Sequence, residues 1–329
     1  RAQTPDFSFF SRPFINPAYT VNPSFATNGI PSRSTTFSQL QPKFSANWKA
    51  NDDFAVYASY GYGFRSGGFN SSGSAATVNT NYGRAGSTVL CLGASFLPPT
   101  CGANAVLNIT DVNDTYRKEV SKAAELGFKS FFLDRRLSLN AAVYHTKVED
   151  MQFFNFFAGP FGLLRVVTNI DEVTIKGFEL DGRWRVNNNV SVFAAYSTTD
   201  GNIDKYVGRP YTAGGEVPYA PKYTGNAGVD FELPFGGSDW VVNARVDASF
   251  VGETWFHPVQ KQRLPNLFTY FQFGQGTFDK MSRDAYYSVN ARVGVSNGKF
   301  GVTAWGRNIT DENYLQEIIP APEFGGSFI

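Results

Sequence analysis

Apolar and polar residues alternate along most of this chain, and residues 54–65 show the pattern most clearly. In "FAVYASYGYGFR" the side chains of Phe54, Val56 and Tyr60 fall on one side, and those of Ser59 and Arg65 fall on the other. Because successive side chains of a β-strand point to opposite faces of its sheet, this period of two predicts a strand with one apolar and one polar face. The stretch is longer than an ordinary globular strand, which has about 5–6 residues.

The same alternation returns along the chain and predicts about ten strands, with no convincing helical stripe between them. The further segments are 43–49, 119–129, 136–145, 177–186, 190–197, 222–233, 240–250, 286–295 and 300–307. The strands reach roughly 10–15 residues, which matches the 9–11 tilted residues with which a strand crosses a bilayer. Aromatic residues gather near the strand ends, where the interfacial girdle of a membrane barrel would lie.

Short and long connections alternate strictly between these strands. The short turns are 50–53, 133–136, 187–189, 234–239 and 296–299, and the long connections are 68–115, 153–162, 200–221 and 252–283. A soluble sandwich has no reason to sort its loops by length, whereas a membrane barrel has short periplasmic turns and long extracellular loops. The sequence therefore predicts an all-β fold, a transmembrane antiparallel β-barrel in a bacterial outer membrane.

The predicted strands do not close a barrel by themselves. The first would start near Phe37 and the last would end near Leu315, which places both ends of the chain on the long-loop side. An open sheet edge in lipid leaves backbone groups unpaired, at a cost of several kcal/mol each. We therefore expect one partial barrel domain over 1–329, with strands and loops over 36–315, loop pieces at 1–35 and 316–329, and further strands before Arg1 and after Ile329.

Composition narrows the class of protein further. Lys and Arg number 29 against 28 for Asp and Glu, and this balance provides no basic surface for a nucleic acid. No run of 18 or more apolar residues predicts a transmembrane helix. Aromatic residues make up 16% of the chain without forming apolar runs, which favours β-structure.

The only two cysteines, Cys91 and Cys101, lie in one segment rich in Gly, Ser, Thr and Asn. Such a pair predicts a local disulfide and an oxidising compartment, the alternative being two free thiols in a reduced protein. Two cysteines without a nearby histidine supply too few ligands for zinc, so we expect no metal site. "TDVND" at 110–114 is a candidate calcium loop, although clusters of Asp and Asn in loops are usually turn formers.

Two sets of residues are candidates for function. The charged residues of the polar faces would line a wet lumen, where they either contact another part of the protein or solvate the interior. They are Arg65, Glu119, Glu125, Glu179, Asp181, Arg183, Arg185, Asp230, Arg245, Asp247 and Arg292. Aromatic residues of the long connections are candidates for ligand contact, the alternatives being the interfacial belt and loop–loop packing. They are Phe153, Phe154, Phe156, Phe157, Trp255, Phe256, His257, Tyr270 and Phe271.

No catalytic constellation accompanies these residues. The only histidines, His145 and His257, are far apart in sequence, and neither has a Ser or Cys at a position that suggests a catalytic pair. "GYGFRSGG" lies within and at the end of a predicted strand and opens no helix, so it does not have the context of a phosphate-binding loop. We expect a protein that is not an enzyme and that carries no cofactor.

Several motifs, in order along the chain, resemble those of TonB-dependent outer-membrane receptors. "QPKFSANWKANDDFAVYASYGYGFRSGGFN" is similar to a mid-barrel hairpin of that family, and "EVSKAAELGFKSFFLDRRLSLNAAVYHTKVEDMQ" is similar to the next hairpin. "VTNIDEVTIKGFELDGRW" resembles the strand with K-G-x-E, and "AWGRNITDENYL" resembles the penultimate strand with N-L-T-D-x-x-Y. The resemblance covers about 36–315 and is nearest to the group abundant in sphingomonad-like bacteria.

The resemblance implies a barrel of about 22 strands, of which this chain would supply fewer than half. The family's N-terminal plug domain and energy-coupling box have no counterpart in the chain. The resemblance also implies TonB-coupled uptake of a scarce solute, such as a siderophore–iron complex, and contact between the charged lumen residues and the plug. The partners it implies are outer-membrane lipid, the plug, the TonB complex and a small-molecule substrate. The alternatives are a passive porin-like channel and, against the loop pattern, a surface adhesin.

Overall fold

The structure of the chain is a computed structural model. It describes residues 33–70, 74–75, 113–159, 162–261, 263–264, 276–277, 281–321 and 326–328. Several predicted features lie outside these residues: the disulfide between Cys91 and Cys101, positions 110–112 of the candidate calcium loop, and the aromatic residues Tyr270 and Phe271.

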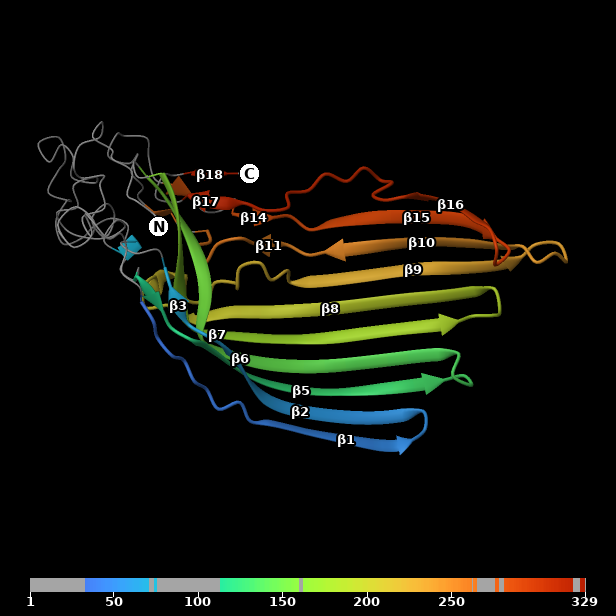
Figure 1. Ribbon diagram of the computed structural model, residues 1–329, viewed down its shortest axis with the longest axis horizontal. Coiled ribbons are helices and arrows are strands. Elements are labelled where there is room, and N and C mark those ends of the chain that lie inside the picture. Colours follow the sequence, from blue (N-terminus) through green and yellow to red (C-terminus); the bar gives the residue numbers. More distant parts are fainter. Residues whose placement is uncertain are drawn as a thin grey trace, which may run out of the picture.

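One antiparallel sheet of ten strands dominates the fold (Figure 1). The strands follow one another in the sheet in the order in which they occur along the chain. They are β1 (Lys43–Asn51), β2 (Phe54–Arg65), β5 (Glu119–Phe132), β6 (Leu137–Gly159), β7 (Gly162–Arg185), β8 (Val190–Lys205), β9 (Tyr223–Pro234), β10 (Val241–Val251), β15 (Tyr286–Ser296) and β16 (Gly301–Gly306). The predicted all-β class and the predicted strand number are confirmed.

The long connections contain short elements of their own. Among the described residues, the two-stranded pairs are β3 (Gly68–Phe69) with β4 (Thr115–Tyr116), β11 (Thr254–Trp255) with β14 (Ser282–Arg283), β12 (Arg263–Leu264) with β13 (Gly276–Thr277), and β17 (Ile319–Ala321) with β18 (Gly326–Phe328). One 3-10 turn, η4 (Pro210–Thr212), lies between β8 and β9. No helix in the described part of the chain is long and apolar enough to cross a membrane.

Short turns and long connections lie at opposite ends of the sheet, as Figure 1 shows, and we call these the short-turn end and the long-loop end. Asparagine side chains build three of the short turns. Asn51, Asn187 and Asn297 each accept a hydrogen bond on Oδ1 from a backbone N–H two residues further on, at 2.8 Å, 2.8 Å and 3.1 Å. Such Asx turns reverse the chain within a few residues, so the predicted alternation of connections is present in the fold.

Aromatic rings on one face of the sheet lie over glycines of the neighbouring strand. The register pairs Tyr57 with Gly127, Tyr144 with Gly177, and Phe193 with Gly228. A Cβ atom at Gly228 would lie 2.5 Å from Cζ of Phe193 and 2.7 Å from the carbonyl oxygen of Val246. Each ring therefore occupies the space that a side chain would fill, and this arrangement resists a slip of register.

Residues 153–162 differ from the prediction of a long connection. Here β6 and β7 continue as one hairpin, and the two strands reach 23 and 24 residues. Phe153, Phe154 and Phe156 place aromatic side chains on both faces of the hairpin, so the alternation that marks a strand is absent. The strand forms because Phe has a high β-propensity and because alternate residues of the hairpin exchange backbone hydrogen bonds with the facing strand.

The last strand is shorter than predicted. β16 ends at Gly306, whereas the prediction continues the strand to about Leu315. Asn308 has a φ of 48°, and its Oδ1 accepts a hydrogen bond from the backbone N–H of Glu312 at 3.1 Å. This left-handed residue and its side-chain bond form a turn that ends the ladder. β1 likewise starts later than predicted, at Lys43.

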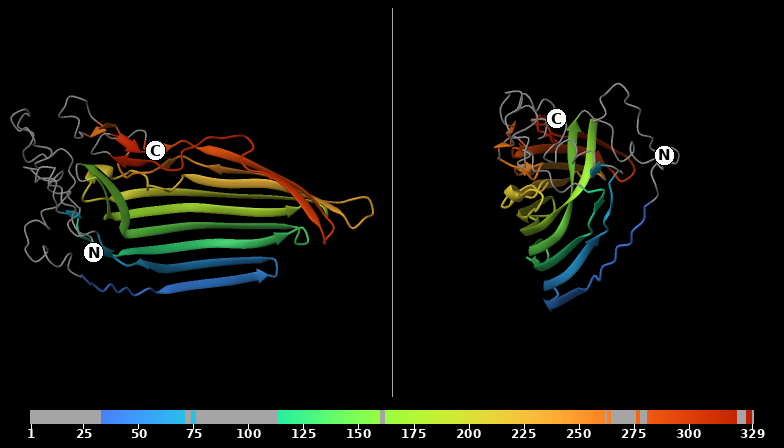
Figure 2. Two further views of the ribbon diagram at one scale, coloured as in Figure 1. Left: turned by 45° about the horizontal axis from the view of Figure 1, so that its top comes forward. Right: turned by 90° about the vertical axis from the view of Figure 1, so that its left-hand side faces the viewer.

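Residues 150–171 form an extension of the sheet that we call the arm. β5 pairs with β6 only as far as Glu149, and β8 pairs with β7 only as far as Glu172. Beyond these two residues, β6 and β7 pair with each other alone in the sheet. Figure 2 shows the resulting hairpin rising from the long-loop end.

The substitution Gly228→Ala should destabilise the barrel by about 1–3 kcal/mol, because the new methyl group overlaps a backbone oxygen that cannot move freely. Gly61→Ala is the matched control, since a Cβ atom there would meet its nearest neighbour, Cγ of Lys43, at an ordinary 3.4 Å. The measurement is the temperature at which each full-length variant in detergent loses its heat-modifiable migration on a gel. Equal temperatures for the two variants would contradict this steric clash at Gly228.

Candidate functional site at the long-loop end

The charged residues predicted for the lumen share one face of the ten-stranded sheet, which we call the inner face. The register places Arg65 opposite Glu119, and Arg245 between Asp230 and Arg292. The other members are Glu125, Glu179, Asp181, Arg183, Arg185 and Asp247, which have the same parity along their strands. Contact of these residues with a plug stays a prediction.

Polar contacts join four strands on the inner face. Arg183 of β7 donates to Asp230 of β9 at 2.9 Å, and Arg245 of β10 lies 3.5 Å from the same carboxylate. Arg245 also pairs with Asp247 at 2.8 Å, and Asp247 accepts a hydrogen bond from Asn290 of β15 at 2.9 Å. A hollow of about 440 Å³ opens over this network, so the inner face is concave and polar here. Such a surface suits water or the polar surface of another protein segment.

The opposite face of the sheet is apolar and exposed. Leu126, Val143, Val246 and Val293 are each about half exposed, although they come from four different strands. Large apolar side chains exposed on four strands of one sheet face are unusual on a soluble protein. They fit a surface that lipid covers.

Of the six predicted ligand-contact residues whose side chains the structure describes, four are buried at the long-loop end. The side chains with 6% exposure or less are Phe153, Trp255, Phe256 and His257. They present little surface to a ligand in this arrangement and pack against neighbouring connections instead. Phe154 and Phe156, on the arm, are only half-buried, and the side chain of Phe157 lies outside the described part of the chain.

An apolar cluster interrupts the polar inner face near the long-loop end. Val148, Val173 and Ile203 hold inner-face positions on β6, β7 and β8, and Tyr206 and Val217 of the β8–β9 connection pack onto them. Backbone hydrogen bonds also join this connection to β8. The connection therefore folds back over the sheet. The sequence signal is clearest on β7, where Val173 holds an inner-face position and the inner-face positions nearer the short turns are Glu179, Asp181 and Arg183.

The β8–β9 and β10–β15 connections pack together as one unit. The side-chain amide of Gln260 accepts a hydrogen bond from the backbone N–H of Glu216 at 2.9 Å and donates one to its carbonyl at 2.7 Å. Gln260 thus bonds to the other connection as a neighbouring strand would. An apolar cluster that includes Trp255, Met281 and Ile318 lies in the same region.

Aromatic contacts connect the arm with these loops. The ring of Phe154 lies 5.6 Å from that of Phe156 and 5.9 Å from that of Tyr219. The guanidinium of Arg165 lies 4.5 Å from the centroid of Phe154. Burial, together with a hydrogen bond to Glu317, raises the pKa of Tyr219 above its ordinary value. Rings beside a guanidinium form a surface on which a flat anionic molecule can bind.

Sequence reasoning did not find two members of this aromatic surface. Arg165 and Tyr219 lie outside the aromatic runs of the long connections, so composition alone does not distinguish them from other loop residues. Arg165 becomes recognisable only once 153–162 is known to be a hairpin. Its partner across the two strands is then Phe156, next to Phe154.

His257 is a buried residue of the β10–β15 connection. Its Nδ1 accepts a hydrogen bond from the backbone N–H of Val259 at 3.1 Å, and its ring lies 6.4 Å from that of Phe153. Burial, and after it the charge of Arg209, hold the pKa of His257 well below its ordinary value of 6.5. His257 is therefore neutral at physiological pH and packs as part of the loop cluster.

Within the described residues, no group of three or more His, Cys, Asp or Glu side chains is placed to hold a metal ion. Asp114, at the described end of the candidate calcium loop, accepts a hydrogen bond from the backbone N–H of Ala75 at 3.0 Å and lies 3.8 Å from Arg33. These contacts join Asp114 to two other segments of the chain, and calcium binding there stays a prediction.

An antiparallel meander with an apolar outer face, a charged concave face and connections sorted by length defines the class of outer-membrane β-barrels. Within that class, the chain belongs to the TonB-dependent receptor family: a family model described as "TonB dependent receptor-like, beta-barrel" matches residues 10–309. It is thus a protein of the Gram-negative outer membrane, from a family of transporters and not of enzymes. The predicted family, fold and location are confirmed.

Solved structures show the same fold. The ferric yersiniabactin uptake receptor FyuA from Yersinia pestis matches with a TM-score of 0.56 and 18% identity, over 84% of this chain and 33% of that chain. The siderophore receptor PiuA from Acinetobacter baumannii matches at 0.52 and 15%, over 87% and 34%. The copper transporter OprC matches at 0.53 and 15%, over 85% and 35%. The chain therefore spans about a third of the length of these proteins.

Acidification should loosen the long-loop end. Below pH 6.5, the unfolded chain protonates His257 while the folded chain keeps it neutral, so the unfolded state binds more protons. The stabilisation of the loop cluster by neutral His257 is then complete above pH 6.5 and falls as pH drops towards the folded pKa, by at most about 1.4 kcal/mol per pH unit.

The rate of limited proteolysis of the long connections, compared at pH 7.5 and pH 5.5 on the full-length protein, measures this effect. His257→Gln should remove the pH dependence, because glutamine can still accept a hydrogen bond and does not titrate. His145→Gln should leave the pH dependence in place. A wild-type rate that does not change between the two pH values would contradict the assignment.

Proposed function

We propose that this chain forms part of an outer-membrane receptor that binds a scarce solute outside the cell and imports it by TonB-coupled active transport. The observation that carries the proposal is the packing of the arm and two long connections into one ordered aromatic surface in a barrel of this family. A passive channel gains nothing from such an ordered surface at its mouth, because its solutes need only diffuse past.

We further propose a siderophore–iron complex, or a similar flat anionic chelate, as the solute. Phe154, Phe156 and Arg165 supply half-exposed rings and an exposed guanidinium, which together suit an aromatic anion. Of the structural neighbours above, one is named as a ferric yersiniabactin uptake receptor, one as a siderophore receptor and one as a copper transporter, so the fold by itself is compatible with more than one metal-containing solute.

The inner face is the surface that we assign to the plug of the full-length protein. Its network contains both signs of charge within a few ångströms, from Arg183 and Arg245 to Asp230 and Asp247. A polar protein segment can replace water at such a surface without leaving a charge unpaired.

Charge reversal in this network should loosen the plug. Arg245→Glu would put a third carboxylate beside Asp230 and Asp247, and the repulsion should favour displacement of the plug. We expect cells that carry this variant to become several-fold more sensitive to an antibiotic too large for ordinary porins. Arg135→Glu, at the short-turn end, is the control and should have no such effect. Equal sensitivity of the two strains would count against plug contact.

A deletion strain complemented with the full-length gene tests the transport function. Uptake of iron-labelled siderophores under iron limitation should depend on the gene and should stop when TonB is absent. Uptake that continues without TonB would favour the porin-like alternative. Surface attachment without any uptake would favour the adhesin.

Truncation of the arm aromatics should weaken solute binding. Phe154→Ala and Phe156→Ala should each raise the apparent KM of uptake roughly tenfold, as expected when a partly exposed aromatic contact is lost. Phe300→Ala is the matched control, because Phe300 is 73% exposed and lies next to the β15–β16 turn at the short-turn end. An unchanged KM in both arm variants would exclude this surface as the solute site.

A further inference from the structure

Four carboxylates occupy consecutive positions at the base of the arm. Glu149 lies opposite Glu172 in the β6–β7 register, and Asp150 and Asp171 take the next positions on the same two strands. Like charges across a strand pair destabilise the pairing. A hairpin with such a base keeps a fixed direction only if cations neutralise it.

Two lysines neutralise the glutamates, one carboxylate each. Lys122 of β5 pairs with Glu149, and Lys147 of β6 pairs with Glu172 at 2.8 Å. Lys122 joins β5 to β6, and Lys147 joins β6 to β7 directly. The charges of Asp150 and Asp171 still require a cation of their own.

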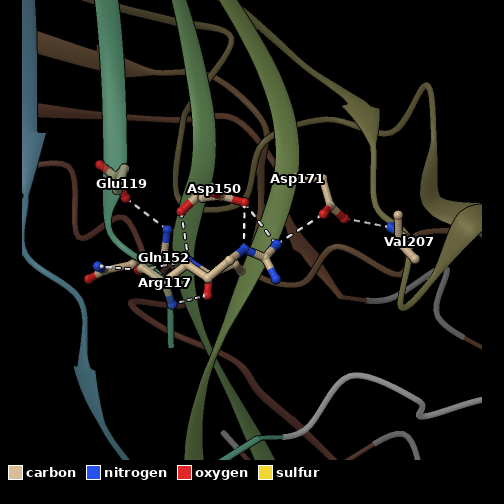
Figure 3. A network of polar contacts seen from close by, with 7 residues as sticks. Arg117, Glu119, Asp150, Gln152, Asp171 and Val207 are labelled. Carbon is tan, nitrogen blue, oxygen red and sulfur yellow. Dashed lines mark hydrogen bonds and ion pairs between the residues drawn. The ribbon is translucent and has the colours of Figure 1, made fainter. Parts of the chain in front are cut away.

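Arg117 bridges the two aspartates. Its Nε donates to Oδ1 of Asp150 at 2.8 Å, and its guanidinium also donates to Oδ1 of Asp171 at 3.0 Å, as Figure 3 shows. The planar fork of arginine can bond two carboxylates at once, which a lysine does less well. Arg117 itself lies outside the arm, between β4 and β5, so it ties both strands of the arm to a different segment.

The same cluster reaches the connections on both sides of the arm. Asp171 accepts a second hydrogen bond from the backbone N–H of Val207, in the β8–β9 connection, at 2.7 Å. On the other side, the backbone N–H of Gln152 donates to Glu119 of β5 at 2.7 Å (Figure 3). The base of the arm is therefore bonded to β5 and to the connection that carries Tyr219.

The backbone changes direction at the same place. Asp150 has a φ of 57°, in the left-handed region that a residue other than glycine seldom adopts. The side chain of Asn169 donates to the carbonyl oxygen of Asp150 at 2.8 Å and accepts a hydrogen bond from the backbone N–H of Arg117 at 2.7 Å. Arg117 and Asn169 thus hold the residue at which β6 leaves the barrel wall.

We propose that Arg117 is a positioning residue that sets the direction of the arm over the mouth of the barrel. With Arg117 in place, the arm brings Phe154 against Tyr219 and completes the aromatic surface. Without it, two facing carboxylates repel and the arm samples other directions. The part of the proposal that concerns the solute rests on the proposed function, whereas the direction of the arm is a property of the protein without solute.

The exposure of Arg117, Asp150 and Asp171 determines whether loss of their ion pairs affects local opening of the arm or the stability of the whole barrel. The side chain of Arg117 is 49% exposed and those of Asp150 and Asp171 are 33% and 20% exposed. Ion pairs exposed to this degree contribute little to the stability of a whole domain. We therefore expect a change in local opening of the arm and not in the folding of the barrel.

Hydrogen–deuterium exchange of the full-length protein in detergent tests the proposal. In Arg117→Ala, the amides of residues 151–170 should exchange about three- to tenfold faster, while the barrel keeps its heat-modifiable migration temperature. Arg135→Ala is the matched control, because Arg135 makes a similar 2.8 Å pair with Asp53 at the short-turn end. It should leave exchange in the arm unchanged.

A rescue variant separates repulsion from a general loss of contacts. The triple variant R117A/D150N/D171N removes the facing charges, and it should exchange more slowly in the arm than Arg117→Ala alone. Arg117→Lys should fall between wild type and Arg117→Ala. Unchanged exchange in Arg117→Ala, or a triple variant as fast as the single one, would overturn the proposal.

Solute uptake by the same variants distinguishes this proposal from the proposed function. Faster exchange in the arm together with a raised KM for uptake supports both. Faster exchange with an unchanged KM supports the positioning role and counts against the aromatic surface as the solute site. A raised KM without any change in exchange overturns the positioning role and leaves the transport function standing.

Discussion

The constraint on which this structure depends is the need to pair every backbone N–H and C=O group that lies in lipid. Hydrocarbon offers these groups no partner, so each membrane-crossing strand must bond to strands on both sides. The meander satisfies this requirement with the simplest connectivity, since each strand pairs with the one before it and the one after it. Among the described residues, β1 and β16 each have one such partner. The solved structures reported above match this chain over about a third of their own length.

The same constraint weakens where the wall leaves the membrane. At the long-loop end water can bond to backbone groups, so β6 and β7 can continue as a pair without neighbours. Side chains must then hold the hairpin in position, as neighbouring strands do in the wall. Apolar packing supplies part of this through Val148, Val173 and Ile203, onto which the β8–β9 connection folds. Ion pairs at the base of the arm supply another part.

The barrel wall was predictable from sequence because lipid imposes a strict period of two. Leu126 and Val143 face outward, and Glu125 faces the inner side, as their positions in the sequence predict. The long-loop end has no such rule. Phe153 and Phe154 are adjacent, so both faces of the hairpin are aromatic and the strand signal disappears. Burial of Trp255 and His257 depends on contacts with distant segments, which no local pattern encodes.

Charge is a better means than apolar packing to fix the direction of the arm. An apolar base would have to remain dry, yet this region lies at the border between lipid, loops and water. Apolar contacts are also non-directional, so a hairpin held by them could pivot at little cost. The fork of Arg117, in contrast, bonds Asp150 and Asp171 in one geometry and contributes specificity where it contributes little stability. Asp150 and Asp171 raise the cost of any other arrangement, because a displaced arm would leave these carboxylates without Arg117. The two aspartates, unfavourable side by side at a strand junction, thus make one direction of the arm lower in free energy than its alternatives.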